Sequence, residues 1–186
     1  NVLCDLLSKV IDADGRITVP HFYDDVEEVP AAEREMIAQI PFDEKKYMEA
    51  IGVKALKGEK GYSTLERNSC RPSFDVCGIW GGYTGEGSKT VLPSKAYAKV
   101  SSRLVPHQQH EKISQLFVDY LTQQAPDYVQ VKVTPLHGGE GYVCPIAHPA
   151  YQAAEKGFEK AFGKKPLAVR RGGSIPIISD FEQIGR

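Results

Sequence analysis

A glycine-rich stretch, residues 81–87, is the first part of the chain whose residue types suggest chemistry. Gly82 and Gly87 have the spacing of the two glycines in a phosphate-binding loop, and Lys89 follows them. Ser88 separates the second glycine from the lysine, however, and the residues beyond form a strand pattern, not the helix whose amides would hold a phosphate. We therefore interpret the stretch as a hairpin connection, or as a loop that lets backbone approach a substrate or a neighbouring subunit.

Two further positions could bind a carboxylate. Arg103 falls on the polar side of an alternating segment, where its planar guanidinium could clamp a carboxylate or could simply be solvated. Ser174 follows Arg171-Gly172-Gly173 and lacks the Gly-x-Ser-x-Gly pattern of a nucleophile elbow. We interpret Ser174 as a hydroxyl and backbone-amide donor to a carboxylate, not as a nucleophile.

The histidines and cysteines indicate no metal site. His107 and His110 could pair, but no third ligand stands at suitable spacing, so solvated surface histidines are the favoured interpretation. His137 precedes two glycines, which could mark a hinge or a close backbone approach, but a loop histidine with its hydrogen bonds satisfied is the favoured interpretation. The four cysteines form no Cys-x-x-Cys pair, and we expect Cys70 and Cys77 to be small buried residues.

The composition is that of an ordinary globular protein. The chain has 186 residues, of which 41% are hydrophobic and 25% charged, and its net charge is -1. The length predicts one domain, or one and a fraction. The balanced charge argues against general nucleic-acid binding, and no apolar run approaches the roughly 20 residues of a membrane span. The few cysteines favour a reducing, cytoplasmic setting.

The hydrophobic pattern predicts the elements that must position these residues. Helical spacing predicts helices at 2–11, 31–40, 43–51, 110–124 and 151–162, and alternation predicts strands at 74–80, 90–105, 129–133 and 167–170. The order helix, strand, strand, helix, strand predicts an α+β fold, in which two helices cover one face of an antiparallel sheet. A ferredoxin-like unit of this kind opens with a strand, which would lie upstream of Asn1.

Seven motifs, taken in order, resemble one family. They are Gly15-Arg16-Ile17, Pro41-Phe42-Asp43-Glu44, Arg71-Pro72-Ser73, the run from Gly78 to Pro93, Arg103-Leu104-Val105-Pro106, His137-Gly138-Gly139 and Gly172-Gly173-Ser174-Ile175-Pro176. The set is similar to the carnosinase-like, dinuclear zinc dipeptidases of the metallo-aminoacylase superfamily. The likeness covers essentially the whole chain.

The resemblance implies a division of the chain and a parent enzyme. Residues 1–137 would form a lid or dimerisation domain with a surface insertion at about 16–69, and residues 138–186 would begin the returning catalytic domain, a partial α/β segment. The parent would bind two zinc ions per active site through ligands outside this chain, hydrolyse short peptides and form a cytoplasmic homodimer through the lid. The isolated chain would have no catalytic residue and no activity.

The resemblance also implies roles for four residues. Thr90 matches a threonine that contacts substrate bound in the other subunit, and Arg103 matches the arginine that binds the peptide's C-terminal carboxylate. Gly173 and Ser174 match a backbone and hydroxyl pair that hold the same carboxylate. Two alternatives stay open: the chain is an interaction module on its own, or the dimerisation module of an acyl-amino-acid deacylase or a non-catalytic homologue.

Overall fold

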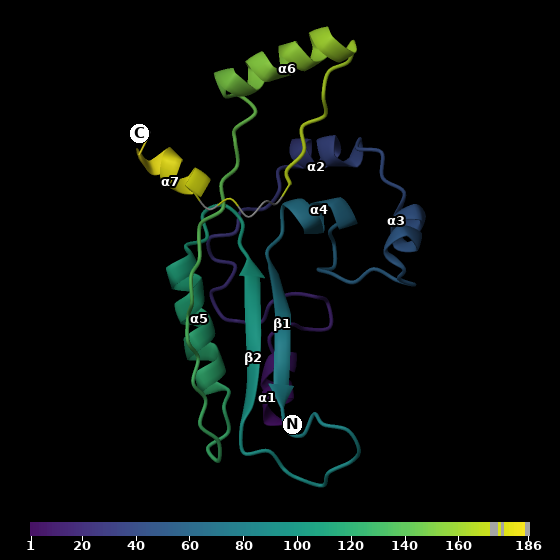
Figure 1. The fold of residues 1–186 in the computed structure, drawn as a ribbon. Helices are drawn as coiled ribbons and strands as arrows, with labels where there is room; N and C mark the ends of the chain where they lie inside the picture. Colours follow the sequence, from purple (N-terminus) through teal and green to yellow (C-terminus); the bar gives the residue numbers. More distant parts are fainter. Residues whose placement is uncertain (172–174, 176, 185–186) are drawn as a thin grey trace.

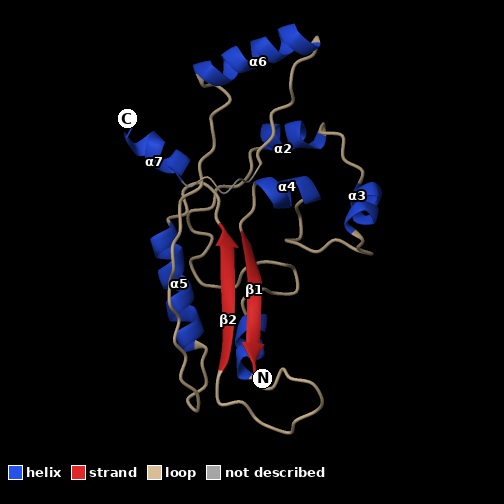
Figure 2. Ribbon diagram, in the orientation of Figure 1, coloured by secondary structure: helices blue, strands red, loops and turns tan. Residues whose placement is uncertain are grey.

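The computed structural model describes residues 1–186 except 172–174, 176, 185 and 186 (Figure 1). Along the described chain the elements are α1 (Val2–Ser8), α2 (Ala31–Ala38), α3 (Glu44–Ile51), α4 (Thr64–Ser69), β1 (Ser73–Gly81), β2 (Ala96–Arg103), α5 (His110–Gln123), α6 (Pro149–Phe162) and α7 (Ile177–Ile184). Figure 2 shows the two strands as one hairpin among the helices, so the predicted α+β class is confirmed. No described helix is both long and apolar enough to cross a membrane.

Local signals explain where several helices begin and end. Asp43 caps the start of α3, and its carboxylate accepts a hydrogen bond from the amide of Lys46 at 3.1 Å. Gly163 caps the end of α6 and takes the left-handed conformation that glycine adopts without strain. α4 was not predicted, although its capping box, Ser63 and Glu66, stands in the sequence.

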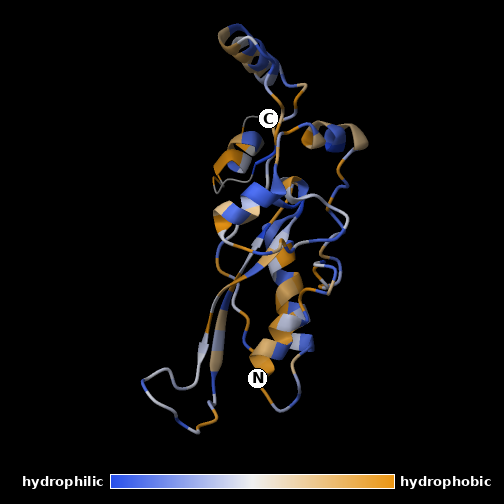
Figure 3. Cartoon of the chain, turned by 90° about the vertical axis from the view of Figure 1, so that its right-hand side faces the viewer, coloured by the Kyte–Doolittle hydropathy of each residue, from blue (hydrophilic) through white to orange (hydrophobic). Residues whose placement is uncertain are grey.

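The core lies where α1, α5 and the start of β1 meet. Its buried side chains are Leu6, Val10, Ile17, Val19, Phe22, Phe74, Ile113, Phe117 and Leu121. The ring of Phe117 stacks on Phe74 at 5.3 Å and meets the ring of Phe22 edge-on at 5.8 Å. Both helices therefore pack against one face of the hairpin, as predicted, and Figure 3 shows them on the same side of it.

Three core residues come from the start of the segment predicted to be a surface insertion. Ile17, Val19 and Phe22 are almost completely buried. The rest of that segment carries α2, α3 and α4, which lie beyond one end of the hairpin in Figure 1. The first part of 16–69 thus contributes to the core.

A β-bulge at Cys77 changes the predicted faces of the hairpin. β1 and β2 are antiparallel, and their register shifts between Val76 and Gly78. Alternation predicts that Phe74, Val76, Gly78 and Trp80 share one face, but the extra residue reverses the alternation beyond it. Trp80 is consequently the partner of Tyr97, on which its ring stacks at 5.4 Å.

The two cysteines that were expected to be buried, Cys70 and Cys77, have different environments, and the bulge decides that of Cys77. Cys70 is buried, as predicted, and burial raises the pKa of its thiol. The prediction that Cys77 is buried is wrong, because the bulged position is exposed and its Sγ lies 3.1 Å from the Oγ of Ser101.

Two predicted strands, 129–133 and 167–170, are not strands in the structure, and the predicted strand 90–105 is shorter than expected. Residues 129–133 keep the predicted alternation, and Val131 and Val133 pack against the core, but the segment is extended without ladder pairing. β2 begins only at Ala96, after Pro93, which has no amide hydrogen to donate. Residues 167–170 are likewise unpaired. A strand pattern becomes a strand only where another strand lies about 4.8 Å away.

The extended segment and β2 line one open groove. Residues 129–134 and the whole of β2 contribute to it, together with apolar side chains of α1 and α5. Among the described residues β2 pairs with β1 alone. The backbone of β2 on the side away from β1, and the backbone of residues 129–134, therefore line the groove without a paired strand among the described residues.

Gly138, directly after His137, lies close to the side chain of His110, and Gly141 lies close to the backbone at Val105. A Cβ on Gly138 would lie 2.7 Å from the Cβ of His110, and a Cβ on Gly141 would lie 2.9 Å from the carbonyl carbon of Val105. Only glycine permits the chain to pass so close to the start of α5 and the end of β2.

Phe117 provides a test of this core. We expect Phe117→Ala to lower the free energy of unfolding by about 3–5 kcal/mol, because it removes a ring that packs on two others. Denaturant unfolding of the chain measures the change. Phe162→Ala is the matched control, since Phe162 on α6 is 74% exposed, and equal losses for the two variants would contradict this assignment of the core.

Candidate functional site

Arg103 is the last residue of β2, and its side chain is exposed on the polar face that the sequence predicted. Lys99 and Ser101 lie on the same face, since alternate residues of a strand share a side. Arg103 lines the groove and is the register partner of Ser73, the first residue of β1. The guanidinium is therefore presented at one end of a rigid hairpin.

Gln108 holds the turn that follows Arg103. Its side-chain oxygen accepts a hydrogen bond from the amide of Val105 at 3.1 Å, and its side-chain nitrogen donates to the carbonyl of Phe22 at 2.9 Å. Gln108 is fully buried, so these bonds replace contacts with water that the groups have lost. Sequence reasoning missed Gln108, because a single polar residue in a loop has no periodic signal.

A buried ion pair holds the other strand at the same end. Arg71 precedes β1 by two residues, and its Nε and Nη2 donate to the two carboxylate oxygens of Glu59 at 2.8 and 2.7 Å. The Arg71 side chain is only 2% exposed and lies over the ring of Tyr62, 4.3 Å from its centre. Burial alone lowers the pKa of Arg71, but the hydrogen bonds and charge of Glu59 outweigh it and raise that pKa. This pair was not predicted.

Thr90 lies far from Arg103. It belongs to the exposed loop between Gly81 and Ala96, at the opposite end of the hairpin (Figure 2). Seven residue steps from Ala96 to Arg103, at about 3.3 Å each, separate the two ends of β2 by roughly 23 Å. The loop is the hairpin connection predicted for residues 81–87, and no helix follows it.

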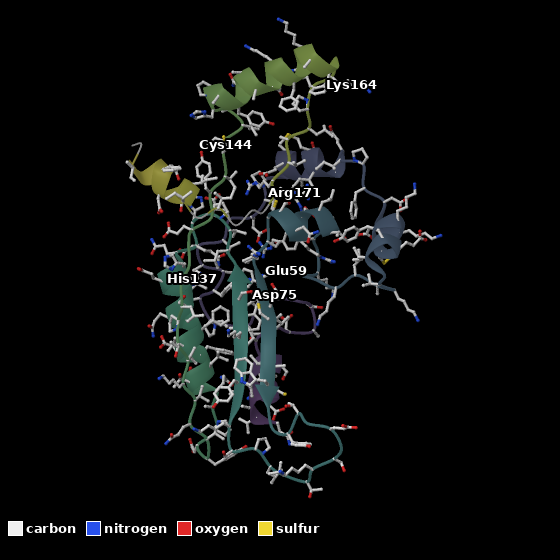
Figure 4. All side chains as sticks on the ribbon, in the orientation of Figure 1. Glu59, Asp75, His137, Cys144, Lys164 and Arg171 are labelled. Carbon is white, nitrogen blue, oxygen red and sulfur yellow. The ribbon has the colours of Figure 1, made fainter. Side chains whose placement is uncertain are left out.

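Gly173 and Ser174, the other two predicted site residues, lie outside the described residues. The chain that leads to them is tied to α2, because Nη2 of Arg170 donates to Oε2 of Glu33 at 2.7 Å. Arg171 lines the same groove as Arg103 and lies near α2 and α4 in Figure 4.

The described side chains form no metal site. His107 is exposed, and its Nε2 lies 3.3 Å from Oε1 of Glu27. The His110 side chain lies close to the backbone of Gly138. Among the described residues no three His, Cys, Asp or Glu side chains gather in a way that could hold a metal ion.

Residues 1–129 match the family described as the peptidase dimerisation domain of the M20 type. The chain belongs to this M20 family. It is 28% identical over 184 residues to the Cys-Gly metallodipeptidase dug1 of Schizosaccharomyces pombe, covering 97% of this chain and 39% of that protein. It is 27% identical over 185 residues to the Beta-Ala-His dipeptidase of Rattus norvegicus, covering 98% of this chain and 38% of that protein.

A solved structure of an M20 family member is also similar to this chain. The M20 family metallo-carboxypeptidase Sso-CP2 from Sulfolobus solfataricus superposes with a TM-score of 0.85 at 29% identity, over 99% of this chain and 42% of that one. The M20 chain thus spans well under half the length of these relatives. The family resemblance drawn from the ordered motifs is confirmed. The names of the relatives imply a metal, and the described residues do not fit one.

Glu66 on α4 is a second buried carboxylate. Burial by itself raises the pKa of Glu66, but hydrogen bonds from Arg34 and Ser63 outweigh it and hold that pKa below its ordinary value. The amide of Ser63 donates to Oε2 of Glu66 at 2.6 Å, which closes the capping box of α4. The charged form of Glu66 therefore stabilises the fold.

This shift predicts a pH dependence. Because the folded-state pKa of Glu66 is lowered, its contribution is complete above its unfolded pKa and is lost as the pH falls through the folded one. We expect Glu66→Gln to flatten the decline of the unfolding free energy between about pH 5 and pH 3, as measured by denaturant titration at each pH. Glu35→Gln on the exposed side of α2 is the control, and a parallel flattening there would argue against Glu66.

Proposed function

We propose that this chain is the lid and substrate-carboxylate-binding part of a zinc-dependent, cytoplasmic dipeptidase that hydrolyses short peptides. Residues 1–137 form the lid and dimerisation domain, and residues 138–186 begin the returning catalytic domain. The two zinc ions bind ligands outside residues 1–186, so the isolated chain is inactive. The dipeptidase names of the relatives support the substrate class.

The position of Arg103 is the observation that carries the proposal. An arginine fork at the end of a paired strand presents two parallel N–H donors to a carboxylate, with little freedom to lose on binding. Buried contacts hold both sides of this end, through Gln108 after β2 and Arg71 before β1. Gly173 and Ser174 would complete the carboxylate site through a backbone amide and a hydroxyl. Recognition of a free C-terminus favours short peptides, since the carboxylate must lie close to the reacting bond.

The separation of Thr90 from Arg103 supports a composite site. A dipeptide is far shorter than the roughly 23 Å length of β2, so one chain could not place both residues on one substrate. In a homodimer formed through the lid, Thr90 of one subunit would reach the substrate held by Arg103 of its partner. The loop that carries Thr90 is suited to this role, because its residues are exposed and do not pack in the core.

Arg103 can be tested in the whole enzyme. We expect Arg103→Ala to raise the KM for a dipeptide by at least about tenfold, because a charge-assisted bidentate contact is lost. The KM for the C-terminal amide of the same dipeptide should change little, since it has no carboxylate. Lys99→Ala, on the same face of β2, is the matched control. Unchanged dipeptide kinetics in Arg103→Ala would refute the clamp.

The composite site can be tested by mixing subunits. We expect Thr90→Ala and Arg103→Ala homodimers each to be impaired, and mixed dimers to recover activity, because one of their two sites then has both residues intact. Co-expression with two different affinity tags isolates the mixed dimer for assay. If the mixed dimer is no more active than its parents, Thr90 does not act across the subunit interface.

A further inference from the structure

Two motifs of the sequence that the proposed site does not use meet at one carboxylate. Arg71, of Arg71-Pro72-Ser73, binds Glu59 through both carboxylate oxygens. Arg16, of Gly15-Arg16-Ile17, approaches the same carboxylate, with its Nη1 3.3 Å from Oε1 of Glu59. We call these three residues the Glu59 anchor. Figure 4 shows Glu59 beside the beginning of β1.

The loop that carries Glu59 is itself fixed. The amide of Lys60 donates to the carbonyl of Asp14 at 2.8 Å. Gly15 has a φ of +80°, and a Cβ there would lie 2.5 Å from the carbonyl oxygen of Gly58. Two backbone segments are thus in direct contact beside Glu59, and the carboxylate has little room to move.

The anchor is connected to Arg103 by a short and regular path. Arg71 is followed by Pro72, whose ring restricts the backbone, and then by Ser73, the register partner of Arg103. The pairing stays in step from Ser73 to Val76, and the bulge lies beyond it. A shift of Arg71 would therefore be passed to the strand end that carries Arg103.

We propose that Glu59 is a positioning residue for substrate: through Arg71 it holds the start of β1, and with it the backbone at Arg103, in the place where Arg103 binds the peptide carboxylate. The inference rests on the proposed role of Arg103. A second carboxylate near Arg71, Glu28, does not serve this purpose, since it is exposed and its Oε1 lies 3.8 Å from Nη1, beyond hydrogen-bond distance.

Glu59→Gln in the whole enzyme tests this. The amide keeps the size of the side chain but removes its charge and one acceptor, so Arg71 loses its paired contact. We expect the KM for a dipeptide to rise about tenfold while kcat changes less, and the KM for the C-terminal amide of that dipeptide to stay within about twofold. Glu28→Gln should leave both KM values unchanged.

Each outcome decides the matter. An equal rise of KM for both substrates, or no rise at all, overturns the positioning role. If Glu59→Gln is unfolded at the assay temperature by circular dichroism, Glu59→Asp, which keeps the charge but shortens the side chain, is judged by the same ratio of KM values. Arg103→Ala separates the two proposals: if it abolishes the preference for the free carboxylate and Glu59→Gln does not, only the positioning role fails. If Arg103→Ala has no effect on that preference, the carboxylate clamp fails, and the positioning role fails with it.

Discussion

The antiparallel pairing of β1 with β2 is the constraint on which the rest of the structure depends. It joins Ser73 to Arg103 at one end and Gly81 to Ala96 at the other, so the two ends have different surroundings. The first end is held by buried polar contacts and the second carries an exposed loop. The rigid hairpin thereby carries Arg103 at one end and the loop between Gly81 and Ala96 at the other. That division suits the composite site proposed for Thr90 and Arg103.

Buried charge is concentrated at the fixed end. Arg71, Glu59 and Glu66 are all buried, and each has a charged partner within hydrogen-bond distance. Such groups add little net stability over apolar residues of the same size, because removing them from water is costly. Their geometry is specific, however, since a bidentate pair tolerates few arrangements. The Arg71–Glu59 pair therefore contributes more to the position of the start of β1 than to net stability.

The groove beside β2 shows that the described sheet has unpaired backbone. Residues 129–134 have the alternation of a strand, and Val131 and Val133 are partly buried, yet no strand among the described residues pairs with them. A ferredoxin-like unit has four strands, whereas the described residues form two. Apolar side chains of α6, among them Phe158 and Phe162, are likewise exposed. Both features agree with a chain that spans well under half the length of its relatives.

The sequence by itself determined the features that depend on neighbours a few residues away. The helical stripe of α5, the glycine-rich connection and the polar face that ends at Arg103 followed from periodicity and residue type. The family followed from the order of short motifs. Tertiary structure alone decided the bulge at Cys77, the unpaired state of residues 129–133 and the meeting of Glu59 with Arg71. The physical reason is that strand pairing, bulges and buried ion pairs require partners distant in sequence. The pattern of one segment does not contain their positions.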